Sequence, residues 1–306
     1  MIKKLTPGII LHLLVIIILL FISLILTSLG KQKTTFDQFF FGSQNLPKLF
    51  PPRDEISPLI EKEVANLPGH WSITIKDLKT GQAYSYKETE LFPSASLYKL
   101  SVMWATLDAI EKNQLQKDQV LSGQKTELDQ TLEGVKNNQS LDTSEEETIS
   151  YSVDEALRLM ITISDNYSAI LLGEKLGWTN IDQLMEKERL SSFDLESGSP
   201  KTTAQATQDL LERIYRGSAV SRKVSEEMKT LLFAQKINDR ISKYLSDDIK
   251  VGHKTGELGD LRHDAGIILG KKSHYIFVFL SETPAPEEAT ETIAKLSKKI
   301  FDALEQ

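Results

Sequence analysis

The chain has 306 residues, of which 40% are hydrophobic and 26% are charged, a composition typical of a globular protein with a substantial core. Its formal net charge is −7 and its basic residues form no stripe, so nucleic acid is not an expected partner. Cysteine is absent, which excludes disulfides, thiolate catalysis and metal sites built on cysteine.

The first 30 residues predict a membrane anchor. Residues 5–29 carry no charge apart from a possible one on His12, and about 20 apolar residues are enough for a helix to cross a bilayer. A cleaved signal peptide is the alternative, but its best cleavage site, Ser28-Leu29-Gly30, fits poorly. Lysines flank the segment on both sides, so charge does not decide its orientation. The expected regions are a tip and transmembrane anchor (1–30), a linker (31–54) and a folded domain (55–306).

The folded domain begins with a short predicted helix around residues 56–66 and two strand-like runs, 71–78 and 82–89, rich in β-branched and aromatic residues. Lys79-Thr80-Gly81 lies between these two runs and predicts a hairpin turn. Residues 94–245 then indicate helices joined by loops. The chain closes with three strand-like runs and a helix (248–256, 262–270, 274–281 and 286–305). This order predicts an α/β protein with a largely antiparallel sheet.

Ser96 and Lys99 stand near the start of an unusual predicted helix. From residue 97 to residue 107 nearly every side chain is apolar, and a helix that is apolar all round is buried. A serine and a lysine three positions apart lie on one helix face. In one interpretation Ser96 only caps the helix and Lys99 reaches water. Ser122 and Lys125 have the same spacing in a polar stretch, so the spacing alone carries little meaning.

A chemical role for the pair is the other interpretation, and the buried helix favours it. Burial disfavours the charged form of a lysine, so Lys99 could accept the proton of the Ser96 hydroxyl and make that hydroxyl a nucleophile. Main-chain N–H groups at the helix start would stabilise an oxyanion formed on the substrate of Ser96.

Two further polar motifs interrupt apolar stretches of the sequence. Ser164-Asp165-Asn166 follows an apolar helix that opens with the capping box Ser152-Val153-Asp154-Glu155. Lys254-Thr255-Gly256 lies at the end of a predicted strand. Either motif alone could be an ordinary turn, so its meaning depends on what accompanies it.

Taken in this order, Ser96-x-x-Lys99, Ser164-Asp165-Asn166 and Lys254-Thr255-Gly256 resemble the motif set of class A β-lactamases and penicillin-binding proteins. The resemblance covers residues 55–306. It implies an α/β (α+β) fold with a five-stranded antiparallel sheet, flanking helices and a helical subdomain. It also implies that the second Lys-Thr-Gly carries chemistry and the first is a turn.

The resemblance implies a role for each matching residue. Ser96 would be the acylated nucleophile, Lys99 its proton acceptor and Ser164 the relay of that proton to the leaving nitrogen. The main-chain N–H groups of Ser96 and Glu257 would form the oxyanion hole. The remaining matches would bind substrate: Asn166 a side-chain amide, Lys254 and Thr255 a carboxylate, and Gly256 would let the substrate lie close to the strand.

One part of the family's site is missing from the sequence. Class A β-lactamases hold the hydrolytic water with a Glu and an Asn on a long loop, whereas the segment SSFDLESGSPK (191–201) is short and has no Asn. Its acids, Asp194 and Glu196, fit solvated loop positions, and Glu196 is at best a substitute for the missing Glu. Deacylation is therefore expected to be slow.

The five histidines predict no metal site, because none belongs to a ligand set of the His-Glu-x-x-His type, and no cofactor is expected. His253 and His263 flank the strands of the expected site. They would pack within the sheet, or either of them could tune Lys254.

These observations predict a membrane-anchored serine hydrolase that acts, as a monomer, on β-lactams or related D-Ala-D-Ala peptides. Such substrates lie outside the cytoplasm, so the N-terminus would be inside a bacterial cell membrane and the folded domain outside it. A D,D-peptidase or transpeptidase of peptidoglycan is the enzymatic alternative. The other alternative is a protein that binds β-lactams or peptidoglycan without turnover.

Overall fold

A computed structural model describes residues 53–133, 147–190, 195 and 198–306, and all of these lie in one compact unit. The expected anchor and nearly all of the expected linker lie outside the described residues. Within the described part of the chain, no helix is both long enough and apolar enough to cross a bilayer.

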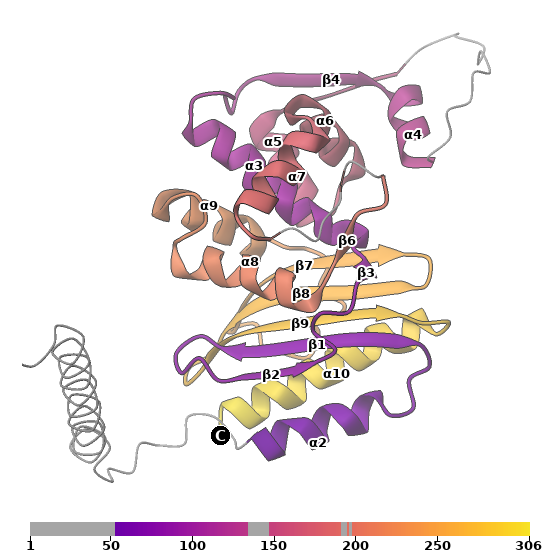
Figure 1. Cartoon of the computed structure of the whole chain (residues 1–306), viewed down its shortest axis with the longest axis vertical. Helices are drawn as coiled ribbons and strands as arrows, with labels where there is room; N and C mark the ends of the chain where they lie inside the picture. The colour runs from indigo at the N-terminus through magenta and orange to yellow at the C-terminus, as the bar shows by residue number, and fades with distance from the viewer. Residues whose placement is uncertain (1–52, 134–146, 191–194, 196–197) are drawn as a thin grey trace, which may run out of the picture. The chain divides into compact units, whose positions relative to one another are not determined.

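A five-stranded antiparallel sheet forms the centre of the unit, with the strand order β2-β1-β9-β8-β7 (Figure 1). Its strands are β1 (His70–Asp77), β2 (Ala83–Tyr86), β7 (Lys250–Leu258), β8 (Leu261–Leu269) and β9 (His274–Glu282). The predicted fold class is confirmed. Because β7 is an edge strand, one side of its main chain is left for contacts outside the sheet.

Helices cover both faces of the sheet (Figure 1). On one face lie α2 (Arg53–Val64) and α10 (Pro286–Leu304), and α8 (Ala204–Arg216) packs on the other face against β1 and β9. Each face of the sheet packs against its own hydrophobic core. Strand β9 contributes to both cores, because successive side chains point to opposite faces. Phe277 and Phe279 belong to the core beneath α10, whereas Ile276 and Val278 belong to the larger core on the α8 side.

The larger core continues into a helical subdomain around α3 (Lys99–Glu111). Every residue of α3 from 99 to 107 is buried, as the apolar run predicted. Four helices pack around α3 (Figure 1): α5 (Val153–Thr162), α6 (Asn166–Leu176), α7 (Trp178–Lys187) and α9 (Arg222–Phe233). A further helix, α4 (Lys125–Glu133), contacts α6 from outside.

The prediction of helices and loops alone over residues 94–245 was wrong in part. Two small antiparallel ribbons lie at or within this stretch: β3 (Phe92–Pro93) with β6 (Lys201–Thr202), and β4 (Val120–Gln124) with β5 (Thr148–Ser152). The first ribbon has only two residues in each strand, too few to show a pattern. In the second ribbon β5 (TISYS) alternates polar and apolar residues, but its partner β4 (VLSGQ) does not, and neither was recognised as a strand.

The first Lys-Thr-Gly is a hairpin turn between β1 and β2, as predicted. The carboxylate of Asp77 accepts hydrogen bonds from the main-chain N–H groups of Lys79 (2.8 Å) and Thr80 (2.6 Å). The Lys79 amine donates to the main-chain oxygen of Lys272 on the neighbouring turn. This copy of the tripeptide therefore has a complete structural explanation.

Candidate active site

Ser96 lies in a short 3₁₀-helix, η1 (Ala95–Tyr98), that leads directly into α3. Side chains three positions apart eclipse each other in a 3₁₀-helix, so Ser96 and Lys99 lie on one face. No side chain caps either η1 or α3, so the capping interpretation of Ser96 is wrong. Ala95 has φ +43°, a left-handed conformation that is strained for a residue with a side chain. Strain next to a partly exposed serine is typical of a functional turn.

Lys99 is fully buried (0% exposed), so the interpretation in which it reaches water is wrong. Its amine donates hydrogen bonds to the Ser164 main-chain oxygen (2.6 Å), the Asn166 side-chain oxygen (2.7 Å) and the Ser164 hydroxyl (3.3 Å). Burial lowers the pKa of Lys99 from 10.5 to about 7, and the negative charge of Asp165 opposes this shift. Much of Lys99 is therefore an uncharged base near neutral pH.

The Ser164-Asp165-Asn166 motif forms the junction between α5 and α6. Asp165 caps α6 by accepting a hydrogen bond from the main-chain N–H of Ser168 (2.7 Å). Ser164 has φ +60°, so, like Ala95, it is a non-glycine residue in the left-handed region. This turn directs the Ser164 hydroxyl and main-chain oxygen at the Lys99 amine.

Lys254 reaches the same hydroxyl from strand β7. Its amine, also 0% exposed, donates to the Ser164 hydroxyl (2.9 Å) and to the main-chain oxygen of Thr255 (2.8 Å). Burial holds the pKa of Lys254 well below its usual value; Lys99 and Arg240 lower it further, and Asp264 raises it. One serine hydroxyl thus lies between two buried lysine amines.

The main chain of β7 presents its free edge to this site. The main-chain oxygens of His253 and Thr255 face away from β8, because they accept hydrogen bonds from the Gln235 side chain (3.3 Å) and the Lys254 amine. Main-chain direction repeats every second residue along a strand, so the main chain of Glu257 also faces outward. The expected oxyanion N–H of Glu257 is therefore on the open side of the sheet.

Gly256 allows η1 to lie against β7. A Cβ atom at this position would stand 3.1 Å from the Cβ of His263 and 3.3 Å from the Cγ of Leu97, the residue after Ser96. Any side chain would press on the η1 turn or on β8. The glycine thus has a packing role in addition to the substrate-facing role that the sequence suggested.

His263 fixes the segment that precedes Ser96. One ring nitrogen donates to the main-chain oxygen of Pro93 (2.8 Å), and the other accepts from the main-chain N–H of Ser281 (3.1 Å). Burial lowers the pKa of His263 to about 4, so the ring is neutral and keeps this pattern at physiological pH. His263 therefore packs within the sheet and holds the segment before Ser96 through the Pro93 main-chain oxygen.

His253 joins β7 to the loop that follows α9. One ring nitrogen lies 2.9 Å from an Asp264 carboxylate oxygen, and the other lies 3.1 Å from the side-chain oxygen of Asn238. Both histidines are thus held by hydrogen bonds within the fold, and the charges that act on Lys254 belong to other residues.

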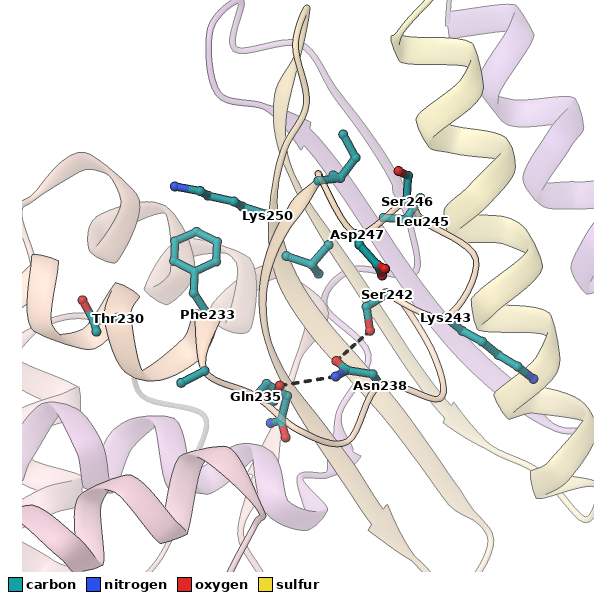
Figure 2. Close-up of a pocket in the computed structure, with 13 residues that line it drawn as sticks. Thr230, Phe233, Gln235, Asn238, Ser242, Lys243, Leu245, Ser246, Asp247 and Lys250 are labelled. Carbon is teal, nitrogen blue, oxygen red and sulfur yellow. Dashed lines mark hydrogen bonds between the residues drawn. The ribbon is translucent and has the colours of Figure 1, made fainter.

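A pocket of about 650 Å³ adjoins this loop, and Figure 2 shows it between the end of α9 and the start of β7. Its lining includes Phe233, Gln235, Asn238, Ser242 and Val251. The pocket reaches only the first residues of β7, so it is separate from the lysine amines near Ser164.

The same loop carries a charged residue that the sequence interpretation missed. Arg240 is 1% exposed, and its guanidinium donates to the Glu257 carboxylate (2.5 Å). Arg240 stands between Asp239 and Ile241 and matches none of the motifs found in the sequence, so it was not singled out. Its location beside β7 adds a buried cation to the site.

Asp194 and Glu196 lie outside the described residues. Between them, Leu195 is buried in the larger core, and its main-chain N–H donates to the Asp182 carboxylate (2.9 Å). Among the residues that the structure does describe, no group of three acidic or histidine side chains could hold a metal ion.

Comparison with known proteins identifies the family. The model of a β-lactamase enzyme family, Beta-lactamase2, matches residues 51–304. The chain belongs to this family. A β-lactamase from Bacteroides uniformis is 23% identical over 255 residues, which cover 73% of this chain and 83% of that protein. At the level of the family, the chain is a hydrolase of the β-lactamase type.

Two solved structures share the β-lactamase fold with this chain. PBP-A has a TM-score of 0.72 at 20% identity, and the match covers 84% of this chain and 98% of PBP-A. A β-lactamase from Chitinophaga pinensis has a TM-score of 0.69 at 23% identity, with 81% of this chain and 99% of that one covered. Identities this low show a common fold.

The low pKa of Lys99 can be measured directly. In a side-chain NMR titration the amine should change protonation near pH 7, and Asp165→Asn should move the midpoint lower, because Asp165 raises the pKa and Asn keeps the helix cap. Since the unfolded chain binds the extra proton between about pH 7 and 10.5, the contribution of Lys99 to stability should rise with pH across that window. Asp108→Asn, at the far end of α3, is the control and should leave the midpoint in place. A midpoint above 9 in the native chain would contradict the assignment.

Proposed function

We propose that the chain is a serine acyl-transfer enzyme that is acylated on Ser96 by β-lactams. The observation that carries the proposal is the Ser164 hydroxyl held between the buried amines of Lys99 and Lys254, beside the turn that contains Ser96. Two buried lysines around one hydroxyl are costly for stability, and perturbed groups of this kind concentrate at sites of proton transfer.

In the proposed reaction the Ser96 hydroxyl oxygen attacks the carbonyl carbon of the lactam amide. The uncharged amine of Lys99 takes the hydroxyl proton as the C–O bond forms. The main-chain N–H groups of Ser96 and Glu257 stabilise the negative oxygen of the tetrahedral intermediate. The C–N bond then breaks, and the Ser164 hydroxyl gives its proton to the ring nitrogen while a proton from one of the two lysines replaces it.

The remaining residues of the site would orient the substrate. Lys254 and the Thr255 hydroxyl suit a carboxylate, since an ammonium group and a hydroxyl both donate to an anion. The Asn166 side-chain oxygen already accepts from Lys99, which leaves its NH₂ group for a carbonyl oxygen of the substrate's side chain.

A labelling experiment tests the nucleophile. A fluorescent penicillin should add one label to the folded domain, on Ser96, and Ser96→Ala and Lys99→Ala should each reduce labelling by about 10²-fold or more. Lys79→Ala removes the other Lys-Thr-Gly lysine, which lies in the hairpin turn, and should label at the native rate. Peptide mapping by mass spectrometry gives the labelled residue. A label on Ser122, or labelling that survives Ser96→Ala, would contradict the proposal.

Release of the acyl group is proposed to be slow. The only described residue of the 191–197 segment, Leu195, is apolar and buried, and the sequence provides no Asn beside the acids there. Without a positioned general base, hydrolysis loses about 10²–10⁴-fold. This balance between acylation and release also keeps the D,D-peptidase alternative open, because a peptidase shares the acylation step.

Turnover kinetics test this part of the proposal. A chromogenic β-lactam should give a burst of one product per chain followed by a weak steady rate, and intact mass spectrometry should find the Ser96 adduct for minutes or longer. Fast turnover without an adduct would contradict slow release. In that case an adduct that accumulates only in Glu196→Gln would identify Glu196 as the missing base, and Asp194→Asn is its matched control.

We also propose that residues 1–30 tether the hydrolase to the outer side of a bacterial cell membrane, with its N-terminus inside. The apolar composition of residues 5–29 supports this proposal, as does the location of the proposed substrates outside the cytoplasm. The full chain should fractionate with membranes, and protease added to intact cells should release the domain by cutting within residues 31–54. A free form that begins after Gly30 would identify a cleaved signal instead, and a protected domain would place it in the cytoplasm.

A further inference from the structure

Arg240 is a buried cation whose hydrogen-bonding capacity is only partly used. Its Nη2 atom donates to the Glu257 carboxylate (2.5 Å), and Nη1 lies 3.6 Å from an Asp239 carboxylate oxygen. Both Nε and Nη1 are buried and have no hydrogen-bond partner. A guanidinium group offers five donors, and leaving buried donors unpaired is costly. The Arg240 guanidinium therefore has N–H donors available for an anion, beyond the one that donates to Glu257.

The main chain around Arg240 is held firmly. The N–H of Ile241 donates to the buried Asp264 carboxylate (3.0 Å), and the Ile241 main-chain oxygen accepts from the Ser297 hydroxyl of α10 (2.8 Å). On the other side, Asn238 is bound to the ring of His253. With both flanks fixed, the guanidinium is preorganised at this end of β7.

Arg240 and Lys254 act in the same electrostatic region. The charge of Arg240 lowers the pKa of Lys254, and only Thr255 and Gly256 separate Lys254 from Glu257 on the strand. Thr255 and Glu257 are two positions apart, so their side chains lie on one face of β7. The proposed carboxylate-binding residues and the pair Arg240–Glu257 are thus adjacent.

Glu257 is the anion that pairs with the Arg240 guanidinium, and its side chain is accessible to solvent. Its side chain is 55% exposed, and it also lies 3.5 Å from the guanidinium of Arg262. Turning this carboxylate into solvent would leave the buried guanidinium of Arg240 without its charge partner, which is costly. An incoming carboxylate could therefore replace Glu257 on Arg240 only against this competition.

We infer that Glu257 is a specificity-determining residue, whose carboxylate occupies the anion-binding position on Arg240 and disfavours substrates with a free carboxylate at that end. The inference rests on the proposed function, because it concerns substrate selection at the same site. A substrate whose carboxylate is esterified or amidated does not compete with Glu257 for the Arg240 guanidinium, and the Glu257 carboxylate does not repel it.

The test compares two probes on the full chain: a penicillin with its free carboxylate, and the methyl ester of the same penicillin. The second-order rate constant for acylation of Ser96 is measured with each probe by intact mass spectrometry, and the readout is the ratio of the two constants. Glu257→Gln should raise the acid-to-ester ratio by about tenfold, because it removes one negative charge close to the incoming carboxylate and keeps the side chain's size. Asp260→Asn makes the same charge change on the same hairpin, outside hydrogen-bond reach of Arg240, and should leave the ratio as in the native chain.

A double-mutant cycle shows whether the effect passes through Arg240. In an Arg240→Lys background, which keeps the charge but loses the planar donors, Glu257→Gln should raise the ratio by less than about threefold. If Glu257→Gln leaves the acid-to-ester ratio unchanged or makes it lower than in the native chain, the inference is overturned, because Glu257 would then hold Arg240 in place for the substrate. A native chain that neither probe acylates would overturn the proposed function itself, whereas acylation with an unchanged ratio overturns only this inference.

Discussion

The Ser164 hydroxyl accepts hydrogen bonds from the amines of both Lys99 and Lys254, and both amines are withdrawn from water. Two ammonium groups around one oxygen repel each other, and burial penalises each of them, so the pKa of each amine lies below its usual value. The Lys99 amine also donates to the Ser164 main-chain oxygen and the Asn166 side-chain oxygen, and the Lys254 amine to the Thr255 main-chain oxygen. The charge of Asp165 offsets part of the cost. The rest of the fold has to hold this unfavourable arrangement together.

Three segments far apart in the sequence meet at that hydroxyl, and each is held by a local device. The turn before α3 is strained at Ala95, and its preceding segment is bound by His263. The junction of α5 and α6 is strained at Ser164 and capped by Asp165. Strand β7 carries Gly256, which lets the turn that contains Ser96 approach. The strain persists because the apolar core on both sides of α3 fixes the elements that carry it.

The sequence was informative wherever the cause of a structure is local. The hairpin at 79–81, the cap at Ser152 and the buried helix α3 follow from turn chemistry, capping and apolar pattern, and all were predicted correctly. The site depended on context: Ser122 and Lys125 have the spacing of the proposed catalytic pair, yet Ser122 is exposed and Lys125 pairs with Asp129 (2.6 Å). Arg240 and the small ribbons were missed because their partners lie on segments that only tertiary structure brings together.

Glu257 illustrates how one residue can serve two parts of a site. Its main chain faces the open edge of β7, where an N–H group suits a developing oxyanion, and this proposed function is independent of the side chain. Its carboxylate, in contrast, pairs with Arg240. The side chain at this position can therefore be exchanged without removing the main-chain donor, and the charge beside Lys254 and Thr255 can vary while the groups around Ser96 stay in place. Separation of this kind would allow the fold to keep the proposed acylation chemistry while the anions that it admits change.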